Sequence, residues 1–148
     1  MYHTPPSASS CFEVAAPLAA VLPCFTALGE RAWAPGWQPD LLSGQERRGS
    51  AFRTRAGDGA ETVWVVTDHR PEAGCVSYAR VALGRHVGLV DVACRELAPA
   101  RTQVRVTYTL TPLSPAAAAE VEEFLEPRAF EAYIAGWQPA VSKALGLA

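Results

Sequence analysis

Alternation of hydrophobic and polar residues dominates the middle of the chain. Between residues 45 and 113, apolar side chains recur at every second position in segments separated by short connections that contain Gly, Pro or Asp. A period of two is typical of a strand with one buried face, and short connections favour antiparallel neighbours. The pattern therefore predicts an antiparallel meander of strands at residues 48–55, 61–69, 74–83, 86–97 and 102–113.

The last of these strands shows the clearest alternation. Val104, Val106 and Tyr108 lie on one side of "TQVRVTYTLTPL", and Arg105 and Thr107 lie on the other. Successive side chains of a strand point to opposite faces. We therefore expect the first three to face a covering helix and the other two to face solvent.

Helical spacing replaces this alternation toward the N-terminus. A first strand of about six residues is predicted within "SSCFEVAA" (residues 9–16), after a loosely ordered start at residues 1–8. Apolar residues then recur at helical spacing over residues 17–33, where Pro23 and Gly29 are incompatible with one smooth helix. We expect two short helices in this segment.

The C-terminal segment has the pattern of a long helix. Ser114-Pro115 provides an N-cap followed by proline at the first helical position, and an apolar stripe at helical spacing extends to Leu145. Pro127 and Pro139 each lack a backbone donor, so we expect this helix of about thirty residues to be kinked or split near them. An antiparallel sheet must cover its apolar face, and no other predicted element is long enough to do so.

Composition and charge narrow the functional classes. The 148 residues are 49% hydrophobic and 19% charged, with a net charge of -2, as expected for a single globular domain spanning residues 1–148. Neither this charge nor the scattered arginines favour nucleic acid or an anionic membrane as a partner. No CxxC pair, metal-ligand spacing or cofactor-binding motif occurs in the sequence, so we expect no metal and no cofactor.

One apolar run, at residues 15–28, is as hydrophobic as the core of a signal peptide. No Lys or Arg precedes it, two prolines interrupt it, and it is too short to span a bilayer. We therefore expect a cytoplasmic protein with no integral membrane segment.

The stretch "ERAWAPGWQPD" (residues 30–40) places two tryptophans four residues apart around a turn. Pro35 and Gly36 favour a turn that brings the side chains of Trp33 and Trp37 close together. The pair either plugs the end of the core or covers the entrance of a pocket. We expect Trp37, beyond the turn, to act as a lid and Trp33, on the helix side, to anchor the core.

The order of elements, together with "ERAWAPGW", "ETVWVV", "YARV" and "VTYTLTPLS", resembles the SRPBCC, or START-like, superfamily. The resemblance covers about residues 9–145 and is greatest to the bacterial polyketide cyclase/dehydrase and lipid-transport branch. It implies an α+β helix-grip fold, in which a curved antiparallel sheet wraps around the long C-terminal helix and leaves a hydrophobic cavity between them. It carries over no catalytic set, so the catalytic residues stay unknown.

Aromatic residues are the main candidates for lining such a cavity, because ligand pockets are mostly apolar with a few placed polar groups. Each of them could equally be an ordinary core residue. With one arginine included, the predicted ligand-binding set is Trp33, Trp37, Trp64, Tyr78, Arg80, Tyr108, Phe130, Tyr133 and Trp137.

The strand at residues 74–83 leaves one ambiguity. Tyr78 and Arg80 share one face, but both faces are partly apolar, so alternation alone does not show which is inside. If they point inward, the charge of Arg80 needs a partner. Asp91, Glu61 or an anionic ligand could supply it.

Three function classes follow. The first is binding of a small hydrophobic or amphipathic molecule resembling a lipid, a polyketide or an aromatic compound. The second is a polyketide cyclase or dehydratase that uses the same cavity, since Tyr and Arg can act by positioning and polarisation without a catalytic triad. The third is a protein-interaction module. The expected partner is a small apolar molecule, and a homodimer is left open.

Overall fold

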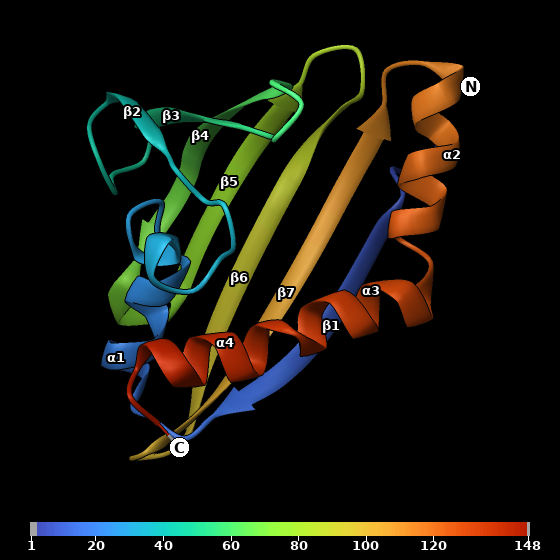
Figure 1. Cartoon of the computed structure of the whole chain (residues 1–148). Coiled ribbons are helices and arrows are strands. Elements are labelled where there is room, and N and C mark those ends of the chain that lie inside the picture. The colour runs from blue at the N-terminus through green and yellow to red at the C-terminus, as the bar shows by residue number, and fades with distance from the viewer. Residues whose placement is uncertain (1–2, 148) are drawn as a thin grey trace.

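Seven antiparallel strands form one curved sheet in the computed structural model, which describes residues 3–147 (Figure 1). Their order across the sheet is β1-β7-β6-β5-β4-β3-β2. The strands are β1 (Ser7–Val14), β2 (Asp40–Ser43), β3 (Ala51–Arg55), β4 (Glu61–Arg70), β5 (Cys75–Ala82), β6 (His86–Ala98) and β7 (Arg101–Pro112).

The predicted meander is confirmed as β3 to β7, and the first predicted strand is β1. β1 begins earlier than expected, because Ser7 and Ala8 already pair with Thr109 and Tyr108 of β7. The loosely ordered start is therefore wrong for these two residues, and residues 1 and 2 lie outside the described residues. The alternation predicted for β7 is correct, since Val104 and Val106 are fully buried whereas Arg105 is exposed.

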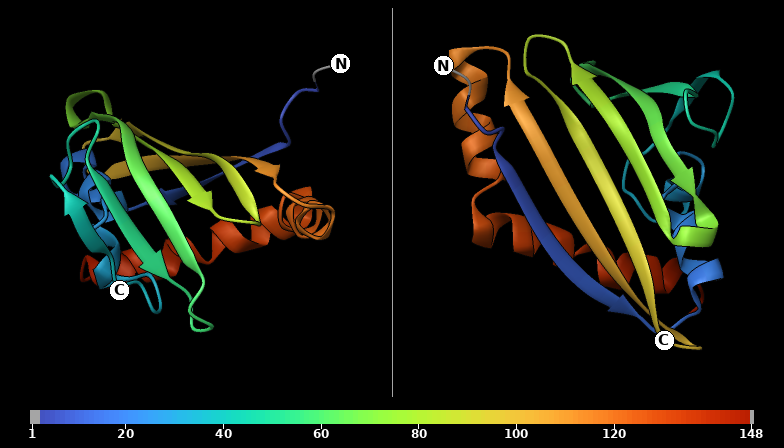
Figure 2. Two further views of the ribbon diagram at one scale, coloured as in Figure 1. Left: turned by 90° about the horizontal axis from the view of Figure 1, so that it is seen from above. Right: turned by 180° about the vertical axis from the view of Figure 1, so that it is seen from behind.

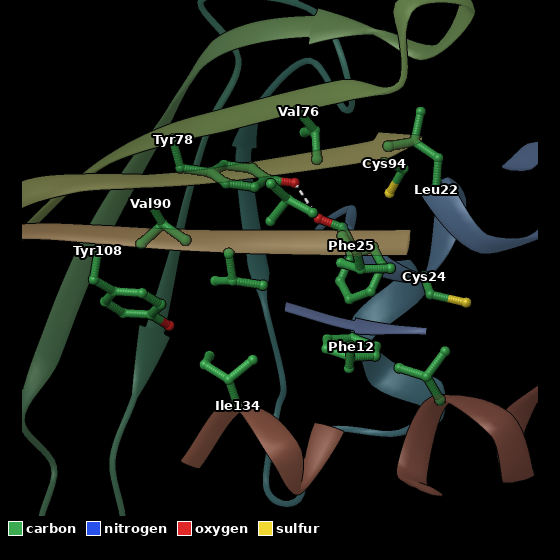
Figure 3. Close-up of a cluster of buried hydrophobic side chains, with 14 of the residues drawn as sticks. Phe12, Leu22, Cys24, Phe25, Val76, Tyr78, Val90, Cys94, Tyr108 and Ile134 are labelled. Atoms are coloured by element: carbon green, nitrogen blue, oxygen red, sulfur yellow. Dashed lines mark hydrogen bonds between the residues drawn. The ribbon is translucent and has the colours of Figure 1, made fainter. Parts of the chain in front are cut away.

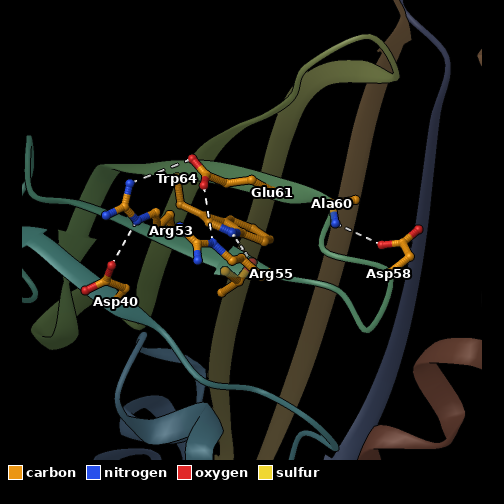
Figure 4. Close-up of polar contacts among 8 residues, drawn as sticks. Asp40, Arg53, Arg55, Asp58, Ala60, Glu61 and Trp64 are labelled. Atoms are coloured by element: carbon orange, nitrogen blue, oxygen red, sulfur yellow. Dashed lines mark hydrogen bonds and ion pairs between the residues drawn. The ribbon is translucent and has the colours of Figure 1, made fainter.

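β2 is a strand that the sequence did not predict. It is only four residues long, and its burial pattern does not alternate. Pairing with β3 holds it at the edge of the sheet, where Arg53 donates a hydrogen bond to Asp40 at 2.8 Å (Figure 4). A strand this short is stabilised by pairing with its neighbour, and its own sequence shows no periodicity that would predict it.

Short helices follow β1, as expected, but there are more of them than predicted. α1 (Leu18–Val21) runs directly into the 3₁₀ helix η1 (Leu22–Phe25), and a second 3₁₀ helix, η2 (Gly29–Ala32), comes next. A further 3₁₀ helix, η3 (Pro71–Ala73), connects β4 to β5.

The C-terminal segment is split into α2 (Pro115–Phe124), α3 (Pro127–Ala135) and α4 (Trp137–Ala144). The break predicted near Pro127 is confirmed. This proline opens α3, and the Glu126 carboxylate caps that helix by accepting from Ala129 N at 2.8 Å. The second break was predicted near Pro139 but lies at Gly136. Pro139 stands in the first turn of α4, where a backbone N–H has no partner within the helix, so proline is tolerated there.

The helices pack on one face of the sheet (Figure 2). α3 and α4 cross the strands and contact β1, whereas α2 stands against β7 (Figure 1). Phe12, Phe25 and Ile134 form part of the core between the two layers (Figure 3). This is the α+β helix-grip arrangement that the resemblance implied. Within residues 3–147, no helix is both long and apolar enough to span a membrane.

Candidate functional site

A hollow of about 640 Å³ lies on the inner face of the sheet, between the η2–β2 segment, strands β3 to β5 and helix α4. We call it the aromatic hollow because six aromatic side chains line it: Trp33, Trp37, Trp64, Tyr108, Tyr133 and Trp137. Its charged lining residues include Glu30, Arg80 and Arg85. The curvature of the sheet and the N-terminal short helices thus create the cavity that the fold implied.

Trp33 and Trp37 are held at the edge of this hollow by similar contacts. The indole of Trp33 donates to the Cys24 carbonyl and that of Trp37 to the Ala27 carbonyl, both at 2.7 Å. Trp33 packs against Trp137 with ring centroids 5.1 Å apart, and Trp37 packs against Trp64 at 5.6 Å.

Both tryptophans are half-buried, so the structure shows no difference in burial between an anchor and a lid. The turn between them forms as predicted, with Gly36 at φ 70° and a hydrogen bond from Trp37 N to Ala34 O at 3.2 Å. A division of roles between the two indoles stays a prediction.

Trp64 forms the wall of the hollow on the β3–β4 side. Its ring stacks on Phe52 with centroids 5.7 Å apart and an interplanar angle of 5°, and its indole donates to Thr54 Oγ1 at 3.0 Å (Figure 4). The Arg80 guanidinium lies over this ring, 4.5 Å from its centroid. This distance is within the range of a cation–π interaction.

Arg80 points into the hollow, and Tyr78 of the same strand face is buried beneath it, which resolves the ambiguity of β5. Neither acidic partner considered from the sequence reaches Arg80. Glu61 pairs with Arg53 and Arg55 at the sheet edge, at 3.9 and 3.4 Å. Asp91 lies opposite Ser77, on the outer face. The buried Nε of Arg80 has no hydrogen-bond partner in the part of the chain that the structure describes.

Glu30 is the acidic residue that shares the hollow with Arg80. Burial raises the pKa of its carboxyl well above the ordinary value, and the positive charge of Arg80 offsets part of this rise. No ion pair joins the two side chains among residues 3–147. A carboxyl with a raised pKa can stay protonated and donate a hydrogen bond or a proton.

The tyrosines differ in what they can offer a ligand. Tyr78 donates its hydroxyl to the Phe25 carbonyl at 2.6 Å, so its proton is already used within the core (Figure 3). Tyr108 is buried, and this burial raises the pKa of its hydroxyl well above the ordinary value. Tyr133 is 47% exposed and packs edge-on against Tyr108, at a centroid distance of 6.5 Å. Tyr108 therefore remains neutral at physiological pH.

A second cavity, of about 240 Å³, adjoins the aromatic hollow beneath α2. We call it the polar pocket. It shares Arg80, Arg85, Tyr108 and Tyr133 with the hollow and adds His86, Leu110, Glu120, Val121 and Phe124. A molecule extending past Arg80 would reach both cavities.

Seven of the nine predicted site residues line the aromatic hollow, and two do not. Tyr78 lines a small void beneath it. Phe130 is a core residue, 1% exposed, whose ring supports Tyr108 at a centroid distance of 5.6 Å.

Sequence reasoning missed Glu30, Arg85, His86 and Glu120. For His86 a signal existed, because it continues the buried alternation of Val90 and Val92. Glu30 has no such signal, because it lies in a short 3₁₀ helix without periodicity.

Residues 6–138 match the family described as polyketide cyclase/dehydrase and lipid transport. No curated protein matches the chain. Solved structures with the same fold include a Thermobifida fusca protein, with a TM-score of 0.74, 18% identity and coverage of 96% of this chain and 95% of the other.

Two other structures with the same fold are those of norcoclaurine synthase and an aromatase/cyclase. Norcoclaurine synthase from Thalictrum flavum, in complex with a transition-state analogue, has a TM-score of 0.71 and 13% identity over 98% of this chain and 96% of its own. The Zhui aromatase/cyclase from Streptomyces sp. R1128 has a TM-score of 0.69 and 18% identity over 95% of this chain and 93% of its own. At these identities the likeness shows the fold.

Proposed function

Because this chain belongs to the polyketide cyclase/dehydrase and lipid transport family, we propose that it binds a small, largely aromatic molecule in the aromatic hollow, with an oxygen atom of that molecule directed at Arg80. The observation that carries this proposal concerns Arg80, whose guanidinium lies over the Trp64 ring and whose buried Nε has no hydrogen-bond partner among residues 3–147. A buried donor left unsatisfied is unfavourable, and a ligand oxygen would satisfy it.

The size and lining of the hollow suit such a ligand. Pockets for small molecules usually measure about 300–1,000 Å³ and combine apolar walls with few polar groups. Burial of about 300 Å² of apolar ligand surface would contribute roughly 7 kcal/mol before the cost of association. We therefore expect a dissociation constant on the order of micromolar.

A pair of naphthalene probes tests the role of Arg80. 2-Naphthol and naphthalene share the same rings but differ in one oxygen, and calorimetric titration measures both affinities. We expect 2-naphthol to bind about tenfold more tightly, and we expect Arg80→Met to remove most of this difference while naphthalene still binds.

Arg105→Met is the matched control, because Arg105 lies exposed on the outer face of β7. It should leave both affinities unchanged. Failure of both probes to bind up to their solubility limits would overturn the binding proposal. A preference for 2-naphthol that survives in Arg80→Met would remove Arg80 from the site.

A cyclase or dehydratase activity is the second candidate, and Glu30 favours it. The Glu30 carboxyl, whose pKa is raised by burial, lines the same hollow as the Arg80 cation. Arg80 could polarise a carbonyl and so acidify its α-hydrogen, which a solvent water takes as the C=C bond forms. Glu30 would give a proton to the β-hydroxyl, whose C–O bond breaks so that it leaves as water, and the solvent proton would restore the Glu30 carboxyl. An aromatase/cyclase and norcoclaurine synthase share the fold, so the scaffold is compatible with catalysis.

Glu30→Gln separates the two candidates. Gln keeps the shape of the side chain but cannot transfer a proton, so an enzyme would lose about 100-fold or more in turnover of a polyketide-like β-hydroxy ketone while still binding it. The absorbance of the conjugated product, which forms when water is released, measures the turnover rate. A binding protein would show no turnover in either form.

A further inference from the structure

Two buried side-chain nitrogens lack a hydrogen-bond partner among residues 3–147, and both belong to residues that line the polar pocket. They are Arg80 Nε and His86 Nε2. Buried polar atoms are nearly always satisfied in folded proteins. Two such exceptions in one cavity point to a group that comes from outside the chain.

Strand register explains why these two side chains converge. Arg80 pairs with Gly88 and His86 pairs with Ala82, so Arg80 and His86 are diagonal neighbours across β5 and β6. Position 88 admits no larger residue, because a Cβ there would lie 1.9 Å from the Thr109 carbonyl oxygen. No polar side chain therefore stands between Arg80 and His86 on the inner face.

The charges of the lining residues favour a ligand group that carries one negative charge. Arg80 and Arg85 are cations and Glu120 is an anion, and Arg85 pairs with Glu120 at 3.4 Å. His86 is 9% exposed, and burial lowers its pKa to about 4, so the imidazole is neutral at pH 7. Tyr108 is uncharged, because burial raises its pKa. Among residues 3–147, Arg80 is then the one cation lining the pocket that has no acidic partner in hydrogen-bond contact.

We infer that the polar pocket binds the carboxylate of an aromatic acid whose ring lies in the aromatic hollow, with Arg80 Nε and His86 Nε2 as its donors. The guanidinium donates from Nε, and a neutral imidazole protonated on Nε2 donates as well. Because the two cavities share Arg80, one molecule can place its ring in the hollow and its acid group in the pocket. This inference rests on the proposed function and adds the chemical class of the ligand.

Two isosteric probes test the inference. 2-Naphthoate carries the carboxylate, whereas 2-naphthamide has the same shape and no charge. We expect the wild-type protein to bind the acid about tenfold or more tightly than the amide, because hydrogen bonds to a charged group are the stronger ones. His86→Phe should reduce this preference to about threefold or less, since one donor is lost and one remains.

His69→Gln is the control, because His69 lies on β4 away from both cavities. It should leave the preference unchanged. NMR titration of His86 provides a test that needs no variant. A bound carboxylate favours the charged imidazole, so 2-naphthoate should raise the His86 pKa from about 4 by one unit or more, and 2-naphthamide should not.

The outcomes distinguish the two proposals. If neither probe binds, the proposed function fails. If both bind equally and the His86 pKa stays near 4 with either probe, the aromatic hollow remains a binding site and the carboxylate inference is overturned.

Discussion

Three ionisable residues that line the two cavities, Glu30, Arg80 and His86, have pKa values shifted toward the neutral form. Burial is the largest cause in each case: it raises the pKa of Glu30, lowers that of Arg80 and lowers that of His86 to about 4. Removal from water disfavours any charge, whatever its sign. These side chains therefore lower the stability of the fold, and their placement suits a ligand site better than a core.

Glu30→Gln should reveal this cost through its pH dependence. The unfolded carboxyl ionises near its ordinary value of 4.5, whereas the folded carboxyl keeps its proton to higher pH. The folded state thus binds more protons above pH 4.5, and the free energy of unfolding of the wild type should fall as pH rises through that region. The variant should lack this fall, gaining about 1.4 kcal/mol for each unit by which the pKa is raised. Urea denaturation between pH 4 and pH 8 measures the difference.

Glu122→Gln, on the exposed face of α2, is the control and should run parallel to the wild type. Parallel curves for Glu30→Gln would mean that Glu30 ionises normally in the folded protein.

The C-terminal helices show what ends an element and what does not. Pro127 is the first residue of α3, which Glu126 caps, whereas Pro139 lies in the first turn of α4 and does not interrupt that helix. Gly136, between α3 and α4, has helical angles, φ -66° and ψ -20°. The chain thus continues from α3 to α4 with little change of backbone conformation.

Gly136→Ala should raise the free energy of unfolding by about 0.5–1 kcal/mol, because alanine loses less conformational entropy in a helical conformation. Space is available, since the new Cβ would lie 3.4 Å from the Tyr133 carbonyl oxygen. Chemical denaturation tests this. Gly36→Ala is the matched comparison: it also has open space, but its φ of 70° disfavours alanine, so it should destabilise by about 1 kcal/mol. Equal losses in both variants would show that α3 and α4 require glycine between them.

At the scale of the whole molecule, two aromatic clusters join distant parts of the chain around the hollow. Trp33, which follows η2, packs against Phe25 of η1 and against Trp137 of α4, and so joins the N-terminal short helices to the C-terminal helix. Trp37 connects the N-terminal segment to Phe52 of β3 and Trp64 of β4. The wall of the proposed binding site is therefore also part of the tertiary structure that holds sheet and helices together.

Trp33→Ala and Trp37→Ala should consequently have similar effects. Each loses a half-buried indole with its hydrogen bond, so we expect each to lower the free energy of unfolding by about 2–4 kcal/mol and to weaken binding of 2-naphthol. Urea denaturation and calorimetry measure the two effects. The Trp→Phe variants keep an aromatic ring and should lose less, about 1–2 kcal/mol. Weaker binding without loss of stability in Trp37→Ala alone would instead support a mobile lid at that residue.

The local sequence pattern was sufficient to assign the buried face of an element where one of its faces is clearly apolar. The alternation of Val104, Val106 and Tyr108 assigned the inner face of β7, and the family resemblance carried by the order of elements and the motifs implied the helix-grip fold. β5 carries no such contrast between its faces, so the inward direction of Arg80 came only from the structure.

Only the tertiary structure brought Glu30, Arg80 and His86 together, since they come from a 3₁₀ helix and two strands. The physical reason is the distance along the chain over which each property is determined. Periodicity records which side of an element avoids water, a property of neighbouring residues in the sequence. The partner of a buried charge depends instead on sheet curvature, strand register and the packing of distant segments, so the environment of Arg80 was decided by the fold as a whole.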